Sequence, residues 1–404
     1  MIRLEEYVPI VGQSVIDDLK LIAARLKGKT IQHINSTSVG GGVAEILNRM
    51  VPLLQELGVD TRWDLIKGGE QFFEVTKKFH NALHGYSSEI TKKDFEIFLE
   101  TNQRNINEIN TSGDIVFVHD PQPIALVKKK RDNKWIWRCH VDVSNPDEKV
   151  WSFLMDYIAR YDSAVFSAPS FSRRLPIRQF LISPSIDPLS DKNKELPQDI
   201  VDAVLLKYKI PQDKPIITQI SRFDRLKDPL GVIEAYQEVK KHIDCRLVLA
   251  GGGAADDPEG AMIFTQVMEK TKNDKDIHIL LLAQNDIEIN ALQRASTVII
   301  QKSIREGFGL TVAEALWKAK PVVASNVGGI PLQIKHKYSG LLCHSVTGAA
   351  FAIKQLLNSP VYAMKLGENG REHIRNNFLI TRHLRDYILL FLSLYYPEDI
   401  VHLG

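Results

Sequence analysis

Two acidic residues eight positions apart, Glu306 and Glu314, flank a glycine-containing turn in the second half of the chain. The apolar stretch 296–301 before the turn is typical of a buried strand, and the apolar spacing over 310–318 predicts a helix. The first turn of such a helix has unpaired N–H groups that can bind phosphate. Carboxylates on either side could accept hydrogen bonds from sugar hydroxyls. A capped surface helix with two solvated acids would explain the same residues.

Two basic residues, Arg222 and Lys227, follow another predicted strand at 215–220. Loops after the strands of open α/β sheets are where ligands bind. A planar guanidinium and a mobile ammonium there could hold a diphosphate. The basic pair Arg222 and Lys227 therefore favours a binding function for the Glu306–Glu314 motif over a capped surface helix.

Strands and helices alternate around these motifs. Strands are predicted near 30–36, 61–66, 114–118, 135–141, 164–167, 179–183, 215–220, 246–250, 277–282, 297–301 and 321–324. Helices are expected between them, including 70–84 and 91–110. This order is typical of the α/β class with doubly wound parallel sheets. The Pro- and Ser-rich stretch 183–191 predicts a boundary between domains 1–188 and 189–377.

Three consecutive glycines, 40–42, follow the first predicted strand. Glycines before a helix suggest backbone that approaches an anion or a reacting sugar, so Gly41 and Gly42 are candidate binding residues. The alternative is a tight turn. A dinucleotide-binding fingerprint would need another glycine where Glu45 stands, and a second cluster at 251–253 fails the same test at Asp256. NAD binding is therefore disfavoured.

Polar residues also end two consecutive strands of the first half. Asp120 follows the strand at 114–118, and His140 lies at the end of the strand at 135–141. The carboxyl ends of parallel strands are binding positions in this class of sheet. A satisfied core or capping histidine is the alternative for His140.

With these motifs, the chain resembles the retaining nucleotide-sugar glycosyltransferases of family 4. The resemblance is carried by Glu306, Glu314 and the Gly-Phe-Gly-Leu between them, with Arg222 and Lys227, and it extends over the whole chain. It implies the GT-B fold, in which two Rossmann-like doubly wound domains face a deep cleft. Domain 1–188 would bind the acceptor, domain 189–377 would bind the nucleotide sugar, and the last helix, within 378–404, would pack back on the first domain.

The resemblance also implies roles for single residues. Glu306 would hold hydroxyls of the donor hexose, and Glu314 the ribose. Asp120 would hold acceptor hydroxyls, and His140 would point to the donor sugar. The catalytic residues are predicted as Arg222, Lys227, Glu306, His140 and Asp120, and the nucleotide-sugar-binding residues as Gly41, Gly42, Arg222, Lys227, Phe308, Gly309, Leu310, Thr311 and Glu314.

Three strings, at 79–83, 119–123 and 184–190, resemble the trehalose glycosyltransferring synthases within that family. Those enzymes reversibly join the glucosyl unit of an NDP-glucose (ADP-, UDP- or GDP-glucose) to free glucose. One departure follows Gly328-Gly329-Ile330-Pro331, where many family members have an acid and this chain has Leu332 and Gln333.

Several alternatives stay open: a retaining trehalose phosphorylase that uses inorganic phosphate, another family-4 transferase such as a sucrose or glycan synthase, and a non-catalytic protein that binds a sugar nucleotide. Glu314 favours a nucleotide, because a ribose contact serves no purpose with phosphate. The presence of Glu306 and both cations favours an enzyme. No carboxylate nucleophile is apparent, so attack on the same face as the leaving phosphate is expected rather than double displacement.

The sequence predicts no metal site and no tightly bound cofactor. Asp274-Lys275-Asp276 is an Asp-x-Asp match that we interpret as a surface turn. Magnesium is expected only as a counter-ion of the nucleotide. The substrates are therefore the small molecules NDP-glucose, glucose and trehalose, and a homodimer is compatible with the sequence.

The composition of the chain and its most apolar segments argue against several other classes of protein. The net charge of the 404 residues is +2, which does not favour a nucleic-acid partner. Three widely spaced cysteines argue against a disulfide framework and for a reducing cytoplasm. The start of the chain lacks the apolar core of a signal peptide, and the most apolar stretch, 387–396, is too short to span a bilayer. A cytoplasmic enzyme without a membrane partner is expected.

Overall fold

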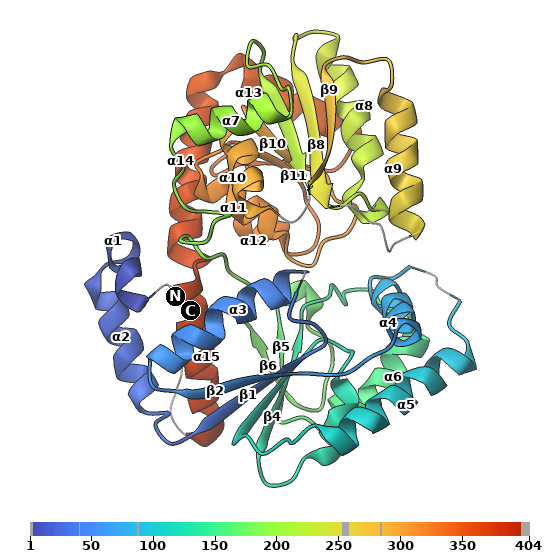
Figure 1. The fold of residues 1–404 in the computed structure, drawn as a ribbon, viewed down its shortest axis with the longest axis vertical. Helices are drawn as coiled ribbons and strands as arrows, with labels where there is room; N and C mark the ends of the chain where they lie inside the picture. Colours follow the sequence, from blue (N-terminus) through green and yellow to red (C-terminus); the bar gives the residue numbers. More distant parts are fainter. Residues whose placement is uncertain (1–2, 40, 87–88, 253–257, 283–284, 397–404) are drawn as a thin grey trace. The chain divides into compact units, whose positions relative to one another are not determined.

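The computed structural model describes residues 3–39, 41–86, 89–252, 258–282 and 285–396. Contacts divide the chain into two compact units (Figure 1). Unit 1 comprises Met1–Ser185 and Ile380–Gly404, and unit 2 comprises Ile186–Leu379. The chain thus passes between units after Ser185 and after Leu379, where the sequence predicts boundaries after residues 188 and 377.

Unit 1 is built on a six-stranded parallel sheet in the order β2-β1-β3-β4-β5-β6. Every one of these strands lies where the sequence predicts it. Strands β1, β3, β4 and β5 are almost entirely buried, because helices pack on both faces of a parallel sheet. The bounds are β1 Thr30–Asn35, β2 Asp60–Leu65, β3 Ile115–His119, β4 Lys134–Cys139, β5 Ser163–Phe166 and β6 Arg178–Leu181.

The helices of unit 1 include α4 and α5 at the expected positions. The last helix, α15, packs on α2 and α3, and its Tyr387 and Phe391 rings lie against Phe117 of β3 at centroid distances of 5.0 and 5.7 Å (Figure 1). Residues 397–404 of the expected C-terminal segment lie outside the described residues. The bounds are η1 Leu4–Tyr7, α1 Val8–Val11, α2 Gln13–Ala24, α3 Gly41–Glu56, α4 Glu70–Leu83, α5 Lys92–Glu108, η2 Ile124–Lys129, α6 Glu148–Ile158, η3 Pro169–Phe171 and α15 Ile380–Tyr395.

Unit 2 contains a second six-stranded parallel sheet, in the order β12-β11-β10-β7-β8-β9. Five of its strands are predicted by the sequence, whereas β12 is not, because its three residues are too few to form a pattern. The strands are β7 Ile216–Ile220, β8 Arg246–Gly252, β9 Ile277–Leu282, β10 Val298–Gln301, β11 Val322–Ser325 and β12 Leu341–Cys343. The helices are α7 Gln198–Lys207, η4 Arg225–Lys227, α8 Pro229–Lys240, α9 Pro258–Thr271, α10 Asp286–Ala295, α11 Leu310–Trp317, α12 Ile330–Gln333, α13 Val346–Asn358 and α14 Pro360–Asn377.

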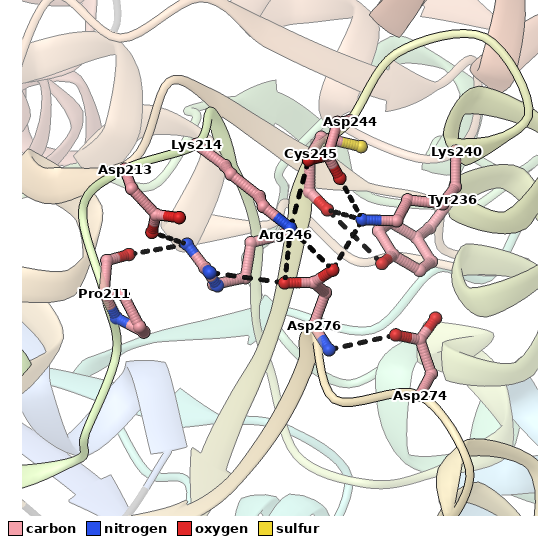
Figure 2. A network of polar contacts seen from close by, with 10 residues as sticks. All are labelled: Pro211, Asp213, Lys214, Tyr236, Lys240, Asp244, Cys245, Arg246, Asp274 and Asp276. Carbon is pink, nitrogen blue, oxygen red and sulfur yellow. Dashed lines mark hydrogen bonds and ion pairs between the residues drawn. The ribbon is translucent and has the colours of Figure 1, made fainter.

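The Asp-x-Asp match of the sequence is part of an ionic network at the amino-terminal edge of the second sheet (Figure 2). Asp276, just before β9, contacts Lys240 at 2.6 Å, Lys214 at 3.0 Å and Arg246 at 3.2 Å. The hydrogen bond from Lys240, followed by that from Lys214, lowers the pKa of Asp276 to about 2. Residues 275 and 276 form a turn, as predicted, with Lys275 exposed and Asp276 partly buried; Asp276 is in addition the shared counter-ion of three cations.

Two further findings concern the pairing of the cysteines and the suitability of the helices for crossing a membrane. All three cysteines are unpaired and buried. Of the helices that the structure describes, none has the length and apolar character needed to cross a bilayer.

Candidate active site

Lys227 and Glu306 form an ion pair in unit 2. Nζ of Lys227 lies 2.6 Å from Oε2 of Glu306, and their side chains are only 19% and 10% exposed. Lys227 ends η4 after β7, and Glu306 lies in the loop after β10, which pairs with β7 in the sheet. The neighbouring strand ends thus bring together two candidate residues that are 79 positions apart in sequence.

The loop that carries Glu306 is held closely by its neighbours. Oγ of Ser303 donates to Oε2 of Glu306 at 3.1 Å, and the backbone N–H of Ile304 donates to the carbonyl of Leu226 at 2.7 Å. Gly328 has a φ of +56°, and a Cβ there would lie 1.6 Å from the carbonyl oxygen of Glu306. The loop therefore requires glycine at 328, a constraint that the local sequence does not reveal.

Helix α11 begins directly after the Gly-Phe-Gly turn, as predicted. Gly309 is its N-cap, with a left-handed φ of +83° and no side-chain cap, so the N–H groups of Leu310 and Thr311 lie at the helix start. The buried Gln333 donates to the carbonyl of Phe308 at 2.5 Å. Gln333, where many family members have an acid, thus supports the turn from α12.

Glu314 is buried inside α11 and is not a solvated surface acid. Its side chain is 2% exposed, accepts from Nε2 of Gln293 at 3.4 Å, and lies 3.9 Å from Nζ of Lys192. Nζ of Lys318 donates to the backbone carbonyl of Glu314 at 3.1 Å, and burial lowers the pKa of Lys318 to about 7. The carboxylate of Glu314 thus has one hydrogen bond and one ion pair, and Lys318 binds the backbone of the same residue.

Arg222 is placed differently from Lys227. Its side chain is 71% exposed and forms an ion pair with Asp224 at 3.2 Å. Arg222 therefore follows β7 as predicted, but its contact in this structure is with its own loop and not with Glu306.

Asp120 and His140 lie together at the carboxyl ends of β3 and β4 in unit 1. The backbone N–H of His140 donates to Oδ1 of Asp120 at 2.8 Å, and the N–H of Asp120 donates to the carbonyl of Arg138 at 2.7 Å. Asp120 has a left-handed φ of +64°, which is uncommon for a residue with a side chain. Burial raises the pKa of Asp120 to about 6, while its hydrogen bond to His140 opposes that shift.

The glycine cluster of unit 1 begins α3. Gly41 has a φ of +79°, and a Cβ there would meet no atom within 4 Å, so conformation and not space requires glycine. Gly42 follows in the first turn of α3. Gly40 lies outside the described residues, as do Gly253 and Asp256 of the second cluster.

Several partners of the candidate residues were not predicted from the sequence. Two of them are close in sequence to the residue that they contact, since Ser303 precedes Glu306 by three positions and Lys318 follows Glu314 by four. The others come from elements distant in sequence, where polar residues at strand ends are the available signal. The full set of these partners is Ser303, Gln293, Lys192 and Lys318 in unit 2, and His33 and His119 in unit 1.

Known proteins match this chain along nearly its whole length. Residues 33–173 match the family model described as trehalose synthase, N-terminal domain, and residues 205–373 match that of glycosyl transferases group 1. The chain is 43% identical to a trehalose synthase of Pyrococcus horikoshii (97% of this chain, 96% of the relative) and 45% identical to one of Rubrobacter xylanophilus (97% of each). Its structure is similar to that of sucrose-phosphate synthase from Thermosynechococcus elongatus, with a TM-score of 0.72 and 17% identity over 91% of this chain and 100% of the other.

Proposed function

Since the chain belongs to the trehalose synthase family and has the GT-B fold with two parallel-sheet α/β domains, we propose that it reversibly transfers a glucosyl unit from an NDP-glucose to free glucose. The product is trehalose, and the configuration at the anomeric carbon of the donor is retained. The enzyme class is that of the hexosyltransferases.

The observation that carries this proposal is the Lys227–Glu306 ion pair beside the start of α11. A nucleotide sugar has a diphosphate next to a hexose, so it needs a cation and a carboxylate close together. Lys227 supplies the cation, and the Glu306 carboxylate accepts hydrogen bonds from the hexose hydroxyls. The N–H groups of Leu310 and Thr311 add hydrogen-bond donors for phosphate. Glu314 is proposed to hold the ribose from within the same helix.

In the proposed reaction, the bond between the anomeric carbon and the diphosphate oxygen breaks, and a bond to the acceptor hydroxyl forms on the same face. The acceptor proton passes to the leaving diphosphate. Lys227 stabilises the charge that develops on the leaving oxygen, and Arg222 is proposed to assist after turning from Asp224. From unit 1, Asp120 and His140 are proposed to hold sugar hydroxyls, with the backbone of Gly41 and Gly42 near the phosphates.

Magnesium is proposed to accompany the diphosphate without protein ligands. In the described ranges, no three His, Cys, Asp or Glu side chains are grouped so that they could hold a metal ion. A cytoplasmic location is also proposed, and the three unpaired, buried cysteines are compatible with it.

The proposal is tested by incubating the purified protein with trehalose and UDP, ADP or GDP, and separately with trehalose and inorganic phosphate. Products are separated by chromatography. NDP-glucose and glucose formed only with a nucleotide support the proposal and rank the bases. Glucose 1-phosphate from phosphate alone would instead establish a phosphorylase, and no turnover in any mixture would refute the trehalose reaction.

Two matched variants connect this activity to the site. Lys227→Met should abolish most turnover. Lys270→Met removes the same charge from an ion pair with Glu234, 2.6 Å long, between α9 and α8, and should retain full turnover. Equal losses in both variants would contradict the assignment of Lys227.

A further inference from the structure

Three histidines of unit 1 are connected through their ring nitrogens. Nδ1 of His33 lies 3.0 Å from Nε2 of His119, and Nδ1 of His119 lies 3.2 Å from Nε2 of His140. Both pairs of rings are stacked, with centroids 5.3 and 5.5 Å apart. His33 belongs to β1, His119 ends β3, and His140 follows β4, so the strand order β1-β3-β4 places the three rings in a row.

The two ends of this row have different surroundings. His33 is fully buried against the Phe117 and Phe391 rings, and its Nε2 has no hydrogen-bond partner in the part of the chain that the structure describes. His140 is only partly buried and lies at the edge of the sheet where ligands bind. Since His140 uses Nε2 for His119 and its backbone N–H for Asp120, its Nδ1 is left for another partner.

All three rings are held neutral by their surroundings. Burial lowers the pKa of His33 to about 3 and holds the pKa of His119 and of His140 well below the ordinary value. The buried guanidinium of Arg138 further disfavours a second positive charge on His119 or His140. A neutral imidazole has one N–H and one lone pair, so each contact in the row has one donor and one acceptor.

The row can therefore run in only two directions. In one, Nδ1–H of His33 donates to His119, Nδ1–H of His119 donates to His140, and His140 carries its own proton on Nδ1. In the other, every proton is on Nε2, and the N–H of His33 points into the apolar wall. Buried N–H groups are almost never left without an acceptor, whereas unpaired acceptors are less rare. The first direction is favoured.

We propose that His119 is a positioning residue that holds His140 as the Nδ1–H tautomer, and that the apolar surroundings at the His33 end fix the direction of the row. His140 then presents a hydrogen-bond donor, and not an acceptor, to an oxygen of the bound glucosyl donor. The inference rests on the proposed function only for the identity of this ligand. The direction of the row is a property of the protein without substrate.

The tautomer is measured by NMR on the full chain labelled with 15N-histidine, with His140→Asn used to assign the His140 signals. We expect the 15N shifts of a protonated Nδ1 and an unprotonated Nε2 in His140. A protonated Nε2, or a signal averaged between both tautomers, would overturn the inference. Because this measurement needs no substrate, it can fail while trehalose chemistry is present, and it can succeed while that chemistry is absent.

Two phenylalanine substitutions separate positioning from packing. His119→Phe keeps an aromatic ring but removes the donor to His140, so the His140 signals should lose the fixed tautomer and kcat/KM should fall about tenfold. His33→Phe leaves the contact between His119 and His140 in place, and the His140 signals should stay unchanged. If His140 keeps its tautomer in His119→Phe, or loses it in His33→Phe, the hydrogen bonds of the row do not run from His33 through His119 to His140 as inferred, and the inference is wrong.

Discussion

Replacing Lys227 by methionine should cost both stability and activity, and a second substitution should restore only the stability. The Lys227–Glu306 pair is 2.6 Å long with side chains 19% and 10% exposed, so it lies between a surface pair and a buried one. Loss of one partner costs about 3–5 kcal/mol when a pair is fully buried and about 0–1 kcal/mol at the surface. Because Ser303 still donates to Glu306, we expect Lys227→Met to lower the free energy of unfolding by about 2 kcal/mol.

The double variant Lys227→Met/Glu306→Gln removes the uncompensated charge as well. Its free energy of unfolding should return to within about 1 kcal/mol of the original protein, which gives a favourable coupling in a double-mutant cycle. Its kcat/KM should remain reduced by at least about 10²–10³-fold, because the charge that stabilises the leaving diphosphate is still absent and the Glu306 carboxylate is lost as well. Denaturant unfolding and steady-state synthesis of trehalose measure the two quantities.

Two results would refute this reasoning. A double variant as unstable as Lys227→Met would show that the pair contributes no coupling energy. A Lys227→Met variant with unchanged kcat/KM would show that the cation does not act on the leaving group. Lys270→Met serves as the control, since its exposed ion pair with Glu234 should contribute less than about 1 kcal/mol.

Three further predictions concern single carboxylates. The pKa of Asp276 is lowered from 3.8 to about 2, so its ionised form adds about 2 kcal/mol to the free energy of unfolding above pH 3.8, and this stabilisation is lost as the pH falls through 2. Asp276→Asn should therefore be less stable than the original protein at neutral pH, and acid unfolding experiments should show the difference between the two disappear at low pH. The pKa of Asp120 is raised from 3.8 to about 6, so the free energy of unfolding should fall as the pH rises from 3.8 to 6. Asp120→Asn should remove this pH dependence of the thermal unfolding temperature and be more stable than the original protein above pH 6. Glu314→Gln should raise the KM for NDP-glucose about tenfold with little change in kcat, as expected for loss of a ribose contact made equally in the ground and transition states, and steady-state kinetics measure both.

Each of these carboxylate predictions has an outcome that would contradict it. Unchanged acid unfolding of Asp276→Asn would mean that the network in Figure 2 does not lower the pKa of Asp276. A parallel pH slope in Asp120→Asn would place the titrating group elsewhere. A fall in kcat without a rise in KM would move Glu314 from ribose binding to the chemical step.

Local patterns in the sequence were enough to predict most elements and the candidate motifs. The strands β1 to β11 each have at least four residues and lie where the sequence predicts strands, whereas β12 has three residues and is not predicted. The Gly-Phe-Gly turn and the start of α11 follow from glycine's access to positive φ and from the apolar spacing after it. These features depend on neighbouring residues only, so the sequence alone determines them.

The contacts that define the site were decided by the tertiary structure. Lys227 and Glu306 meet because β7 and β10 are adjacent in the sheet, and His33 and His119, 86 positions apart, meet because β1 and β3 are adjacent. Asp276 has the same local sequence whether it is a solvated turn or a shared counter-ion. The order of the strands depends on the way in which the helices of the crossover connections pack on the sheet. The residues that determine this packing are distributed over the whole chain and do not lie in any one segment. The sequence therefore determined which groups are available for chemistry, and the order of the strands determined which of them touch.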